Sequence, residues 1–316
     1  MLGRTANDLY WLARYVERAE SMARLIEVGY RIALLPRDEE DEYNEEWRST
    51  LASAGCAEGY LAKYETPNAR DVINYLLFDT TNPSSVMSCL SAARRNGRAQ
   101  RTALTRDMWV ALNDSWMEFS KIKPDDVTAN ELPDMLDWIR SRSALFRGAM
   151  LNTILRADTY YFIQIGTFLE RADNTARILD VKYFVLLPEI EMVGSSVDNV
   201  QWGAILRSVS AHRSYRWVYK QNYRPWRIAE YLIFHRAMPR SLRASYDLIN
   251  TSLDGLAQLC GARHQCHDTA EEITRFLADG DINAVFQSGL HEFLVDFIAK
   301  NNRLGHQVAE AYHFNG

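Results

Sequence analysis

Two stretches of this sequence share one pattern: YVERAESMARLIEV at residues 15–28 and FLERADNTARILDV at residues 168–181. Six of the fourteen aligned positions are identical and six more keep their chemical character, at an offset of 153 residues. Self-similarity at a fixed offset is typical of a fold built from related units. We therefore predict two equivalent helices, one in each half of a large helical bundle with an internal two-fold repeat.

The spacing of charged and small residues inside each stretch indicates which contacts the two helices can make. Glu20 and Arg24 are four residues apart, as are Asp173 and Arg177, and acid before base at this spacing forms an ion pair along a helix face. Small residues at the same spacing would let a neighbouring helix approach closely: Ala19, Ala23, Ala172 and Ala176. Each of the two helices is thus expected to carry a close-packed strip beside a strip of charge.

Three interpretations of these charges remain open. An exposed salt-bridge ladder would contribute only about 0.3–0.5 kcal/mol per pair. A buried structural network would also stabilise little, because desolvation can exceed the Coulomb attraction. The third interpretation is a polar core that binds a ligand or takes part in catalysis. Because the same charges recur in two distant segments, the sequence favours the second and third interpretations.

The rest of the chain also carries helical periodicity. Apolar residues between Leu12 and Ile26 recur at spacings of three and four, which defines one helix face, and strict apolar alternation is rare throughout. We predict an all-α fold and one domain over residues 1–316, with an acidic loop at 38–46, a connector at 121–133 and a loop at 189–199. Helices are expected at residues 5–34, 47–62, 69–78, 84–120 with a break at Asn96-Gly97, 132–155, 159–187, 200–219, 225–235, 239–261, 268–277 and 289–312.

Composition and charge exclude several classes of function. The net charge of −5 and a pI near 5.9 disfavour nucleic-acid binding. No apolar run approaches the ~20 residues that span a bilayer, and the opening residues do not form a signal peptide. We expect a cytoplasmic protein with reduced thiols and no membrane partner.

Cofactor and metal motifs are also missing from the sequence. It contains no P-loop, no Gly-x-Gly-x-x-Gly and no Gly-x-Ser-x-Gly, so no cofactor is expected. Residues 260–267 hold two cysteines and two histidines, but they lack the paired spacing of a structural zinc site. We interpret this segment as a helix-to-loop junction and predict no metal.

The sequence resembles the alpha-E domain family, which comprises bacterial helical proteins named for a Glu-Arg motif. The resemblance covers nearly the whole chain and is carried by residues 1–20, residues 168–183, the Asn82-Pro83-Ser84 segment and the Pro239-Arg240-Ser241 element. One departure lies at residues 93–98, where the family's Ala-Arg-Glu-Asn-Ala-Arg reads Ala-Arg-Arg-Asn-Gly-Arg.

The resemblance implies a functional context. Family members are associated with a circularly permuted ATP-grasp protein and often with a transglutaminase-like protein. ATP-grasp enzymes activate a carboxylate as an acyl phosphate and join it to an amine. The resemblance thus implies a helical partner or co-catalytic subunit of an ATP-grasp-linked system that forms amide or peptide bonds. The alternatives are a stand-alone transferase or amidohydrolase, and a purely structural adaptor.

The candidate polar site combines the two repeated stretches with basic and amide side chains from the family motifs. We expect its ionic side chains to meet in one enclosed place and to grip a substrate that carries both carboxylate and amine, or a phosphorylated acyl intermediate. The candidate residues are Glu17, Arg18, Glu20, Arg24, Arg94, Asn96, Arg98, Glu170, Arg171, Asp173, Arg177 and Arg240.

Overall fold

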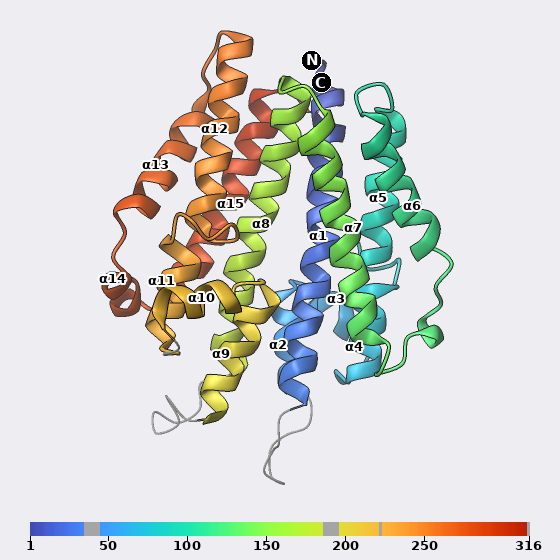
Figure 1. The fold of residues 1–316 in the computed structure, drawn as a ribbon, viewed down its shortest axis with the longest axis vertical. Coiled ribbons are helices and arrows are strands. Elements are labelled where there is room, and N and C mark those ends of the chain that lie inside the picture. The colour runs from blue at the N-terminus through green and yellow to red at the C-terminus, as the bar shows by residue number, and fades with distance from the viewer. Residues whose placement is uncertain (35–44, 186–195, 221–222, 315–316) are drawn as a thin grey trace.

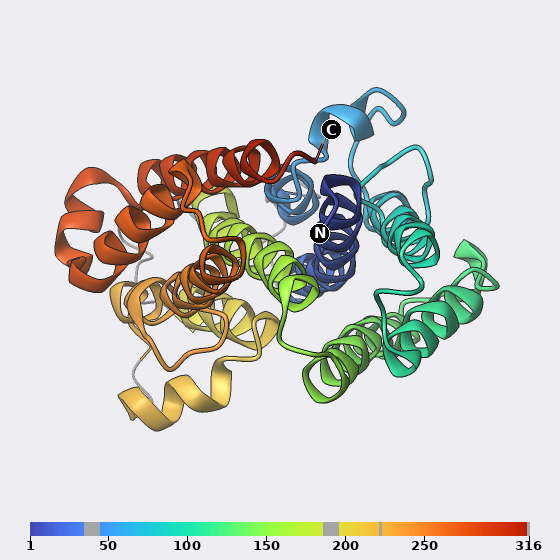
Figure 2. The ribbon, with the colours of Figure 1, turned by 90° about the horizontal axis from the view of Figure 1, so that it is seen from above.

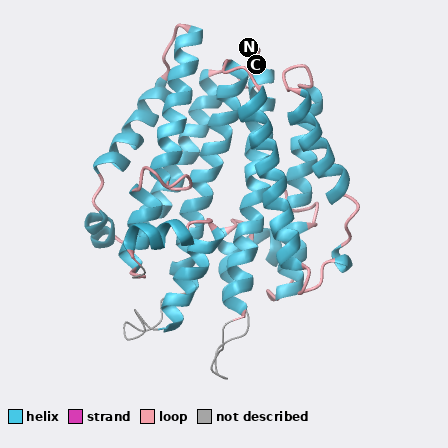
Figure 3. Ribbon diagram, viewed as in Figure 1, coloured by secondary structure: helices cyan, strands magenta, loops and turns pink. Residues whose placement is uncertain are grey.

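The computed structural model describes residues 1–34, 45–185, 196–220 and 223–314. Within these ranges every regular element is a helix and no strand occurs, which confirms the predicted all-α fold (Figure 3). The helices are α1 (Gly3–Ala33), α2 (Glu45–Ser53), α3 (Ala57–Leu61), α4 (Ala69–Leu77), α5 (Val86–Ala99), α6 (Arg106–Phe119), the short 3-10 helix Pro124–Asp126, α7 (Leu132–Thr153), α8 (Asp158–Val185), α9 (Ser196–Ser208), α10 (His212–Tyr219), α11 (Pro225–Phe234), α12 (Leu242–Cys260), α13 (Gln265–Asp279), α14 (Ile282–Ser288) and α15 (Leu290–Ala311).

The two long helices that carry the repeated stretches, α1 and α8, lie side by side at the centre of the bundle (Figures 1 and 2). We call them the motif helices. Helices α5 and α7 pack on α1, and α12 and α15 pack on α8. Helices α2 and α9 each contact both motif helices. The N- and C-termini lie at the same end of the molecule (Figure 1).

Small side chains let the motif helices approach each other. The four predicted alanines, Ala19, Ala23, Ala172 and Ala176, are fully buried. Gly166 of α8 faces the backbone carbonyl of Tyr10 on α1 so closely that a Cβ at this position would collide with it. The close approach places the charged residues of α1 and α8 within reach of one another.

Serine caps fix where two of the flanking helices begin. The Ser85 hydroxyl accepts a hydrogen bond of 3.1 Å from the Ser88 amide at the start of α5. The Ser241 hydroxyl accepts one of 2.9 Å from the Ala244 amide at the start of α12. Such caps satisfy an amide that lacks a partner in the first turn of a helix. Both serines follow a proline by two residues, so the chain enters α5 and α12 in the same way.

Several predicted helix boundaries are wrong. The helix expected at 47–62 is divided into α2 and α3 at Gly55, which has a φ of 67°. The helix expected at 200–219 is divided into α9 and α10 at Ser210, which has a φ of 58°. Left-handed backbone at these residues stops an α-helix. Because each break spans only three residues around one left-handed residue, the apolar periodicity does not reveal it.

The expected break at Asn96-Gly97 is also wrong, because α5 continues to Ala99. Gly97 is buried, and a Cβ there would press on Leu112 of α6 and Leu12 of α1. Its glycine therefore serves a close helix contact, and the break between α5 and α6 falls after Ala99 instead. The helices predicted from the sequence also do not include α14.

Two predicted loops lie mostly outside the described residues. Residues 38–44 of the acidic loop and residues 189–195 of the second loop are not described, and α2 and α9 begin soon after them. Among the helices that the structure does describe, none combines the length and the apolar character needed to cross a bilayer.

Candidate functional site

The Glu-Arg pairs of the two motif helices bind each other reciprocally. Arg171 of α8 donates to Glu17 of α1 from Nε and Nη2, at 2.9 and 3.0 Å. Arg18 of α1 donates to Glu170 of α8 from Nε and Nη2, at 2.6 and 3.0 Å. Bidentate guanidinium–carboxylate pairs of this kind fix geometry as well as charge. The repeated dipeptide thus joins the two helices.

One group of side chains surrounds Glu17 and Glu20, and we call it the Glu17 cluster. Arg240, which lies just before α12, donates from Nη1 to Glu17 at 3.1 Å and from Nη2 to Glu20. Arg147 of α7 lies 2.9 Å from Glu17 and 2.5 Å from Glu20. Both carboxyl groups are 1% exposed and are therefore shielded from water, although the side chain of Arg147 is 19% exposed. The cluster is completed by Arg24, which pairs with Glu20 at 2.6 Å, and by Arg171.

A second group surrounds Glu170, and we call it the Glu170 cluster. Arg14 donates to Glu170 from Nε at 2.7 Å, beside the bidentate contact from Arg18. Asp173 pairs with Arg177 at 2.6 Å along the same helix, as the spacing predicted. The side chains of Arg18 and Arg177 are 21% and 27% exposed. This cluster is therefore more open than the Glu17 cluster.

The carboxyl groups of Glu17, Glu20 and Glu170 remain ionised at neutral pH. Burial alone would raise the pKa of Glu170, but Arg18 and Arg14 outweigh burial and hold the pKa at about 2. Burial likewise opposes, but does not prevent, a lowering of the Glu17 pKa by Arg171, Arg147 and Arg240. Nearby opposite charge favours the charged form of a carboxyl group. Because these groups are buried, the interpretation as an exposed salt-bridge ladder is wrong.

A pocket of about 220 Å³ opens beside the Glu170 cluster, and we call it the motif pocket. Residues of both motif helices and of the turns before α3 and α5 line it. Its polar lining residues are Arg18, Ser21, Ser84, Glu170, Asp173, Asn174 and Arg177.

Asn174 is the most informative of the residues that line the motif pocket. Its side chain is 3% exposed, and neither the amide nitrogen nor the amide oxygen has a hydrogen-bond partner within the described part of the chain. A buried polar group without a partner costs about 1–3 kcal/mol. Asn174 therefore adds an unsatisfied donor and acceptor to a wall that also holds two carboxylates and two guanidinium groups.

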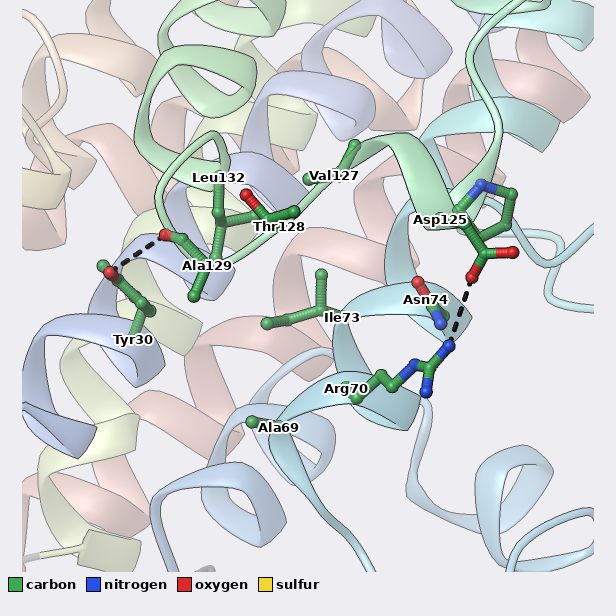
Figure 4. A pocket seen from close by; sticks show the side chains of 11 residues that line it. Tyr30, Ala69, Arg70, Ile73, Asn74, Asp125, Val127, Thr128, Ala129 and Leu132 are labelled. Carbon is green, nitrogen blue, oxygen red and sulfur yellow. Dashed lines mark hydrogen bonds and ion pairs between the residues drawn. The ribbon is translucent and has the colours of Figure 1, made fainter.

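A larger pocket, of about 390 Å³, lies elsewhere, between α1, α4 and the connector before α7 (Figure 4). Its walls are mainly apolar, and its polar contacts are the exposed Arg70–Asp125 ion pair and a hydrogen bond of 3.2 Å from Tyr30 to the Ala129 carbonyl. None of the twelve candidate site residues lines it. Size alone therefore does not identify the functional site in this molecule.

Three of the predicted site residues lie outside both clusters. Arg94 donates to Asn113 of α6 at 3.0 Å, and Asn96 donates to the Asp8 carbonyl at 3.3 Å. Arg98 is exposed on α5. These side chains tie α5 to its neighbours or face water, so we assign them no place in the site. The other nine candidates lie in the two clusters.

Two members of the clusters escaped the sequence analysis. Arg14 lies one helical turn before Arg18 on α1, so its i, i+4 spacing was a signal that could have found it. Arg147 reaches the Glu17 cluster from α7, a helix with no motif of its own, and no pattern in the sequence indicates it. The motif-pocket residue Asn174 lies inside the repeat but aligns with Ser21, so it was not singled out.

The segment of cysteines and histidines lies at a helix junction. Cys260 ends α12, Gly261 follows with a left-handed φ of 70°, and His267 lies in the first turn of α13. The imidazole of His267 is buried and contacts the backbone of Leu253 and His264. Throughout the described ranges, no group of three or more histidine, cysteine or acidic side chains is arranged to hold a metal ion.

Comparison with known proteins gives the chain a family. Residues 1–313 match the Alpha-E model, described as a predicted alpha-helical domain with a conserved ER motif. Two curated relatives, "Uncharacterized protein Mb2597" of Mycobacterium bovis and "Uncharacterized protein MT2643" of Mycobacterium tuberculosis, are each 30% identical over 120 residues. That match covers 34% of this chain and 14% of each relative. No solved structure matches the chain. Since the family model spans nearly every residue, the chain belongs to the Alpha-E family.

Proposed function

We propose that this chain is the ligand-binding helical partner, or co-catalytic subunit, of an ATP-grasp-linked system that forms amide or peptide bonds. The observation that carries the ligand-binding part is the motif pocket, in which the buried Asn174 amide has no partner beside the Glu170 cluster. The link to an ATP-grasp protein, and to a transglutaminase-like protein, rests on the resemblance of the motifs to the Alpha-E family.

Energetic considerations favour a ligand site over a device for stability. Replacing a buried ion network by apolar residues of similar volume is often neutral or stabilising, so such a network is poor evidence for a role in stability alone. An unpaired amide also lowers the stability of the fold. A bound molecule that hydrogen-bonds Asn174 would offset this cost, and Asn174 is among the residues that line the motif pocket.

The adaptor alternative is favoured by one observation, the closed Glu17 cluster. Its carboxylates are held by guanidinium groups from α1, α7, α8 and the turn before α12, so it could serve only to fix how these helices pack. The two functions are compatible, because a rigid Glu17 cluster would hold the motif helices in place beside the motif pocket.

The test variant replaces the Asn174 amide in the motif pocket with an apolar side chain of similar volume. We expect Asn174→Leu to abolish ATP-dependent amide formation when the chain is combined with the ATP-grasp protein of its own host, measured as product and released phosphate. Glu170→Ala is a poorer choice, because it would leave Arg14 and Arg18 buried without a counter-charge.

The matched control is Asn152→Leu, which makes the same substitution at an exposed position of α7. Both variants should unfold at the same temperature as the wild type within a few degrees. Full activity of the Asn174→Leu complex would contradict the ligand-binding function. Amide turnover by the isolated chain, without the ATP-grasp protein, would favour the stand-alone transferase or amidohydrolase.

A further inference from the structure

The turns before α5 and α12 occupy matching places in the bundle. Pro83-Ser84-Ser85 leads into α5, which packs on α1, and Pro239-Arg240-Ser241 leads into α12, which packs on α8. In each turn the last serine caps the helix. Ser84 therefore has in its turn the position that Arg240 has in the other.

Arg240 links two carboxylates of the opposite motif helix. Its Nη1 donates to Glu17 at 3.1 Å and its Nη2 donates to Glu20. In the repeat, Glu17 aligns with Glu170 and Glu20 aligns with Asp173. A matching cation in the other half would therefore lie between Glu170 and Asp173.

No such cation is supplied by the described residues. Of the two carboxylates, Glu170 pairs with Arg14 and Arg18 and Asp173 pairs with Arg177, so no described side chain pairs with both. The residue at the matching turn position is the short Ser84. Ser84, Glu170 and Asp173 instead form walls of the motif pocket. The pocket thus corresponds to the place of the Arg240 side chain in the other half. Asn174, whose amide has no partner among the described residues, is one of its lining residues.

We propose that the motif pocket binds a small zwitterion whose ammonium or guanidinium group links Glu170 and Asp173, as Arg240 links Glu17 and Glu20. This inference deepens the proposed function and rests on its assignment of the motif pocket as the ligand site. It names the class of ligand as a free amino acid or a closely related molecule that carries one cationic and one anionic group.

The charges of the pocket explain why the ligand must carry both signs. The Glu170 cluster has two carboxylates, Glu170 and Asp173, against three guanidinium groups. A simple cation would add to this excess of positive charge, whereas a dianion would face two carboxylates. The partly exposed Arg18 and Arg177 can pair with a ligand carboxylate, since guanidinium groups match its geometry. Asn174 can then bind either end of the ligand.

The decisive variant is Ser84→Arg, which places in the motif pocket the side chain that fills the other half. Binding to the isolated full chain is measured by calorimetry with L-glutamine, β-alanine and guanidinoacetate as zwitterions. Agmatine, which lacks the carboxylate, and succinate, which lacks the amine, complete the set of probes. We expect at least one zwitterion to bind the wild type about tenfold more tightly than agmatine or succinate. Ser84→Arg should weaken that binding about tenfold or more.

The control is Ser141→Arg, which makes the same substitution at an exposed position of α7 and should retain binding within about threefold. Thermal unfolding of Ser84→Arg should occur close to the wild-type temperature, because the three guanidinium groups already present oppose the attraction of the new one to the two carboxylates. The inference is overturned if no zwitterion binds, if agmatine or succinate binds best, or if Ser84→Arg binds as the wild type does.

The two proposals can fail separately. Amino-acid binding that is lost in Ser84→Arg, together with an unaffected partnered reaction in Asn174→Leu, would leave the ligand class standing and remove the proposed function. A lost partnered reaction without any zwitterion binding would do the reverse.

Discussion

The Glu17 cluster and the Glu170 cluster are built from the same repeated motif, yet one is filled by protein and the other adjoins a pocket. Glu17 and Glu20 are linked by Arg240 and Arg147. Glu170 and Asp173 have separate arginine partners, and the space beside them is the motif pocket. The difference teaches that the motif supplies paired carboxylates, while residues outside it decide whether a protein side chain or a pocket lies beside them.

Arg240 and Ser84 hold the same position in the turns before α12 and α5, and they differ in what they place beside the carboxylates. Arg240 is 6% exposed, and its guanidinium group fills the space beside Glu17 and Glu20. Burial lowers the pKa of Arg240, and the neighbouring Arg24 lowers it further, to about 9, so the side chain remains charged at neutral pH. Ser84 is too short to reach across the equivalent space. One long side chain therefore separates a structural network from a candidate binding site.

The largest expected effect compares the two clusters by removing one carboxylate from each. Glu17→Ala should destabilise the protein by about 5 kcal/mol and Glu170→Ala by about 3 kcal/mol, since breaking a buried pair leaves uncompensated charge. Glu17 loses more because it binds three arginines and Glu170 binds two. Urea unfolding of both variants measures the difference. A smaller loss for Glu17→Ala would break the comparison.

Acid should act on the same carboxylates. Because the folded pKa of Glu170 is about 2, below its ordinary value of 4.5, its contribution to stability is complete above about pH 4.5. That contribution, roughly 3 kcal/mol at about 1.4 kcal/mol per pKa unit, is lost as the pH falls from 4.5 towards 2. Urea unfolding at a series of pH values should show a weaker acid loss in Glu170→Gln than in the wild type. Equal acid sensitivity of the two proteins would mean that Glu170 has no depressed pKa.

The two left-handed turns provide a smaller test. Gly55 follows α2 with a φ of 67°, and Ser210 follows α9 with a φ of 58°. Gly55→Ala should cost about 1–2 kcal/mol, because an L-residue disfavours this conformation. Ser210→Gly should change stability less, since relief of backbone strain offsets the lost contact of 3.1 Å between Ser210 and Arg24. Thermal unfolding of both variants distinguishes the turns, and a neutral Gly55→Ala would contradict the backbone argument.

The smallest expected change in stability is at the pocket itself. Asn174→Leu should leave the free energy of unfolding unchanged or raise it by about 1 kcal/mol, because it removes a buried amide that has no partner to lose. Ser21, its counterpart on α1, donates a hydrogen bond of 2.8 Å to the Glu17 carbonyl. Ser21→Ala should therefore cost about 1 kcal/mol. Guanidinium unfolding curves for the two variants would sharpen the contrast, and a large loss in Asn174→Leu would mean that the amide serves the fold.

Local pattern predicted much of the fold correctly. The 3.6-residue periodicity gave long helices close to α1, α7 and α8, and the four-residue spacing gave the Glu20–Arg24 and Asp173–Arg177 pairs. The same reasoning failed at Gly55 and Ser210, because a single left-handed residue interrupts a helix without disturbing its apolar pattern. It also failed at Gly97, where glycine was interpreted as a break although it allows close packing.

The sequence by itself determined the helical class, the Alpha-E resemblance and most charged members of the two clusters, because all of these depend on neighbours within a few turns of helix. Tertiary structure alone decided that Arg18 binds Glu170 and that Arg171 binds Glu17. It also decided that Arg147 enters the Glu17 cluster from a helix without a motif, and that Asn174, with its unpartnered amide, lines the motif pocket. The physical reason is that a guanidinium–carboxylate contact depends on distance in space, and the packing of α1 against α8 sets that distance across about 150 residues of intervening chain.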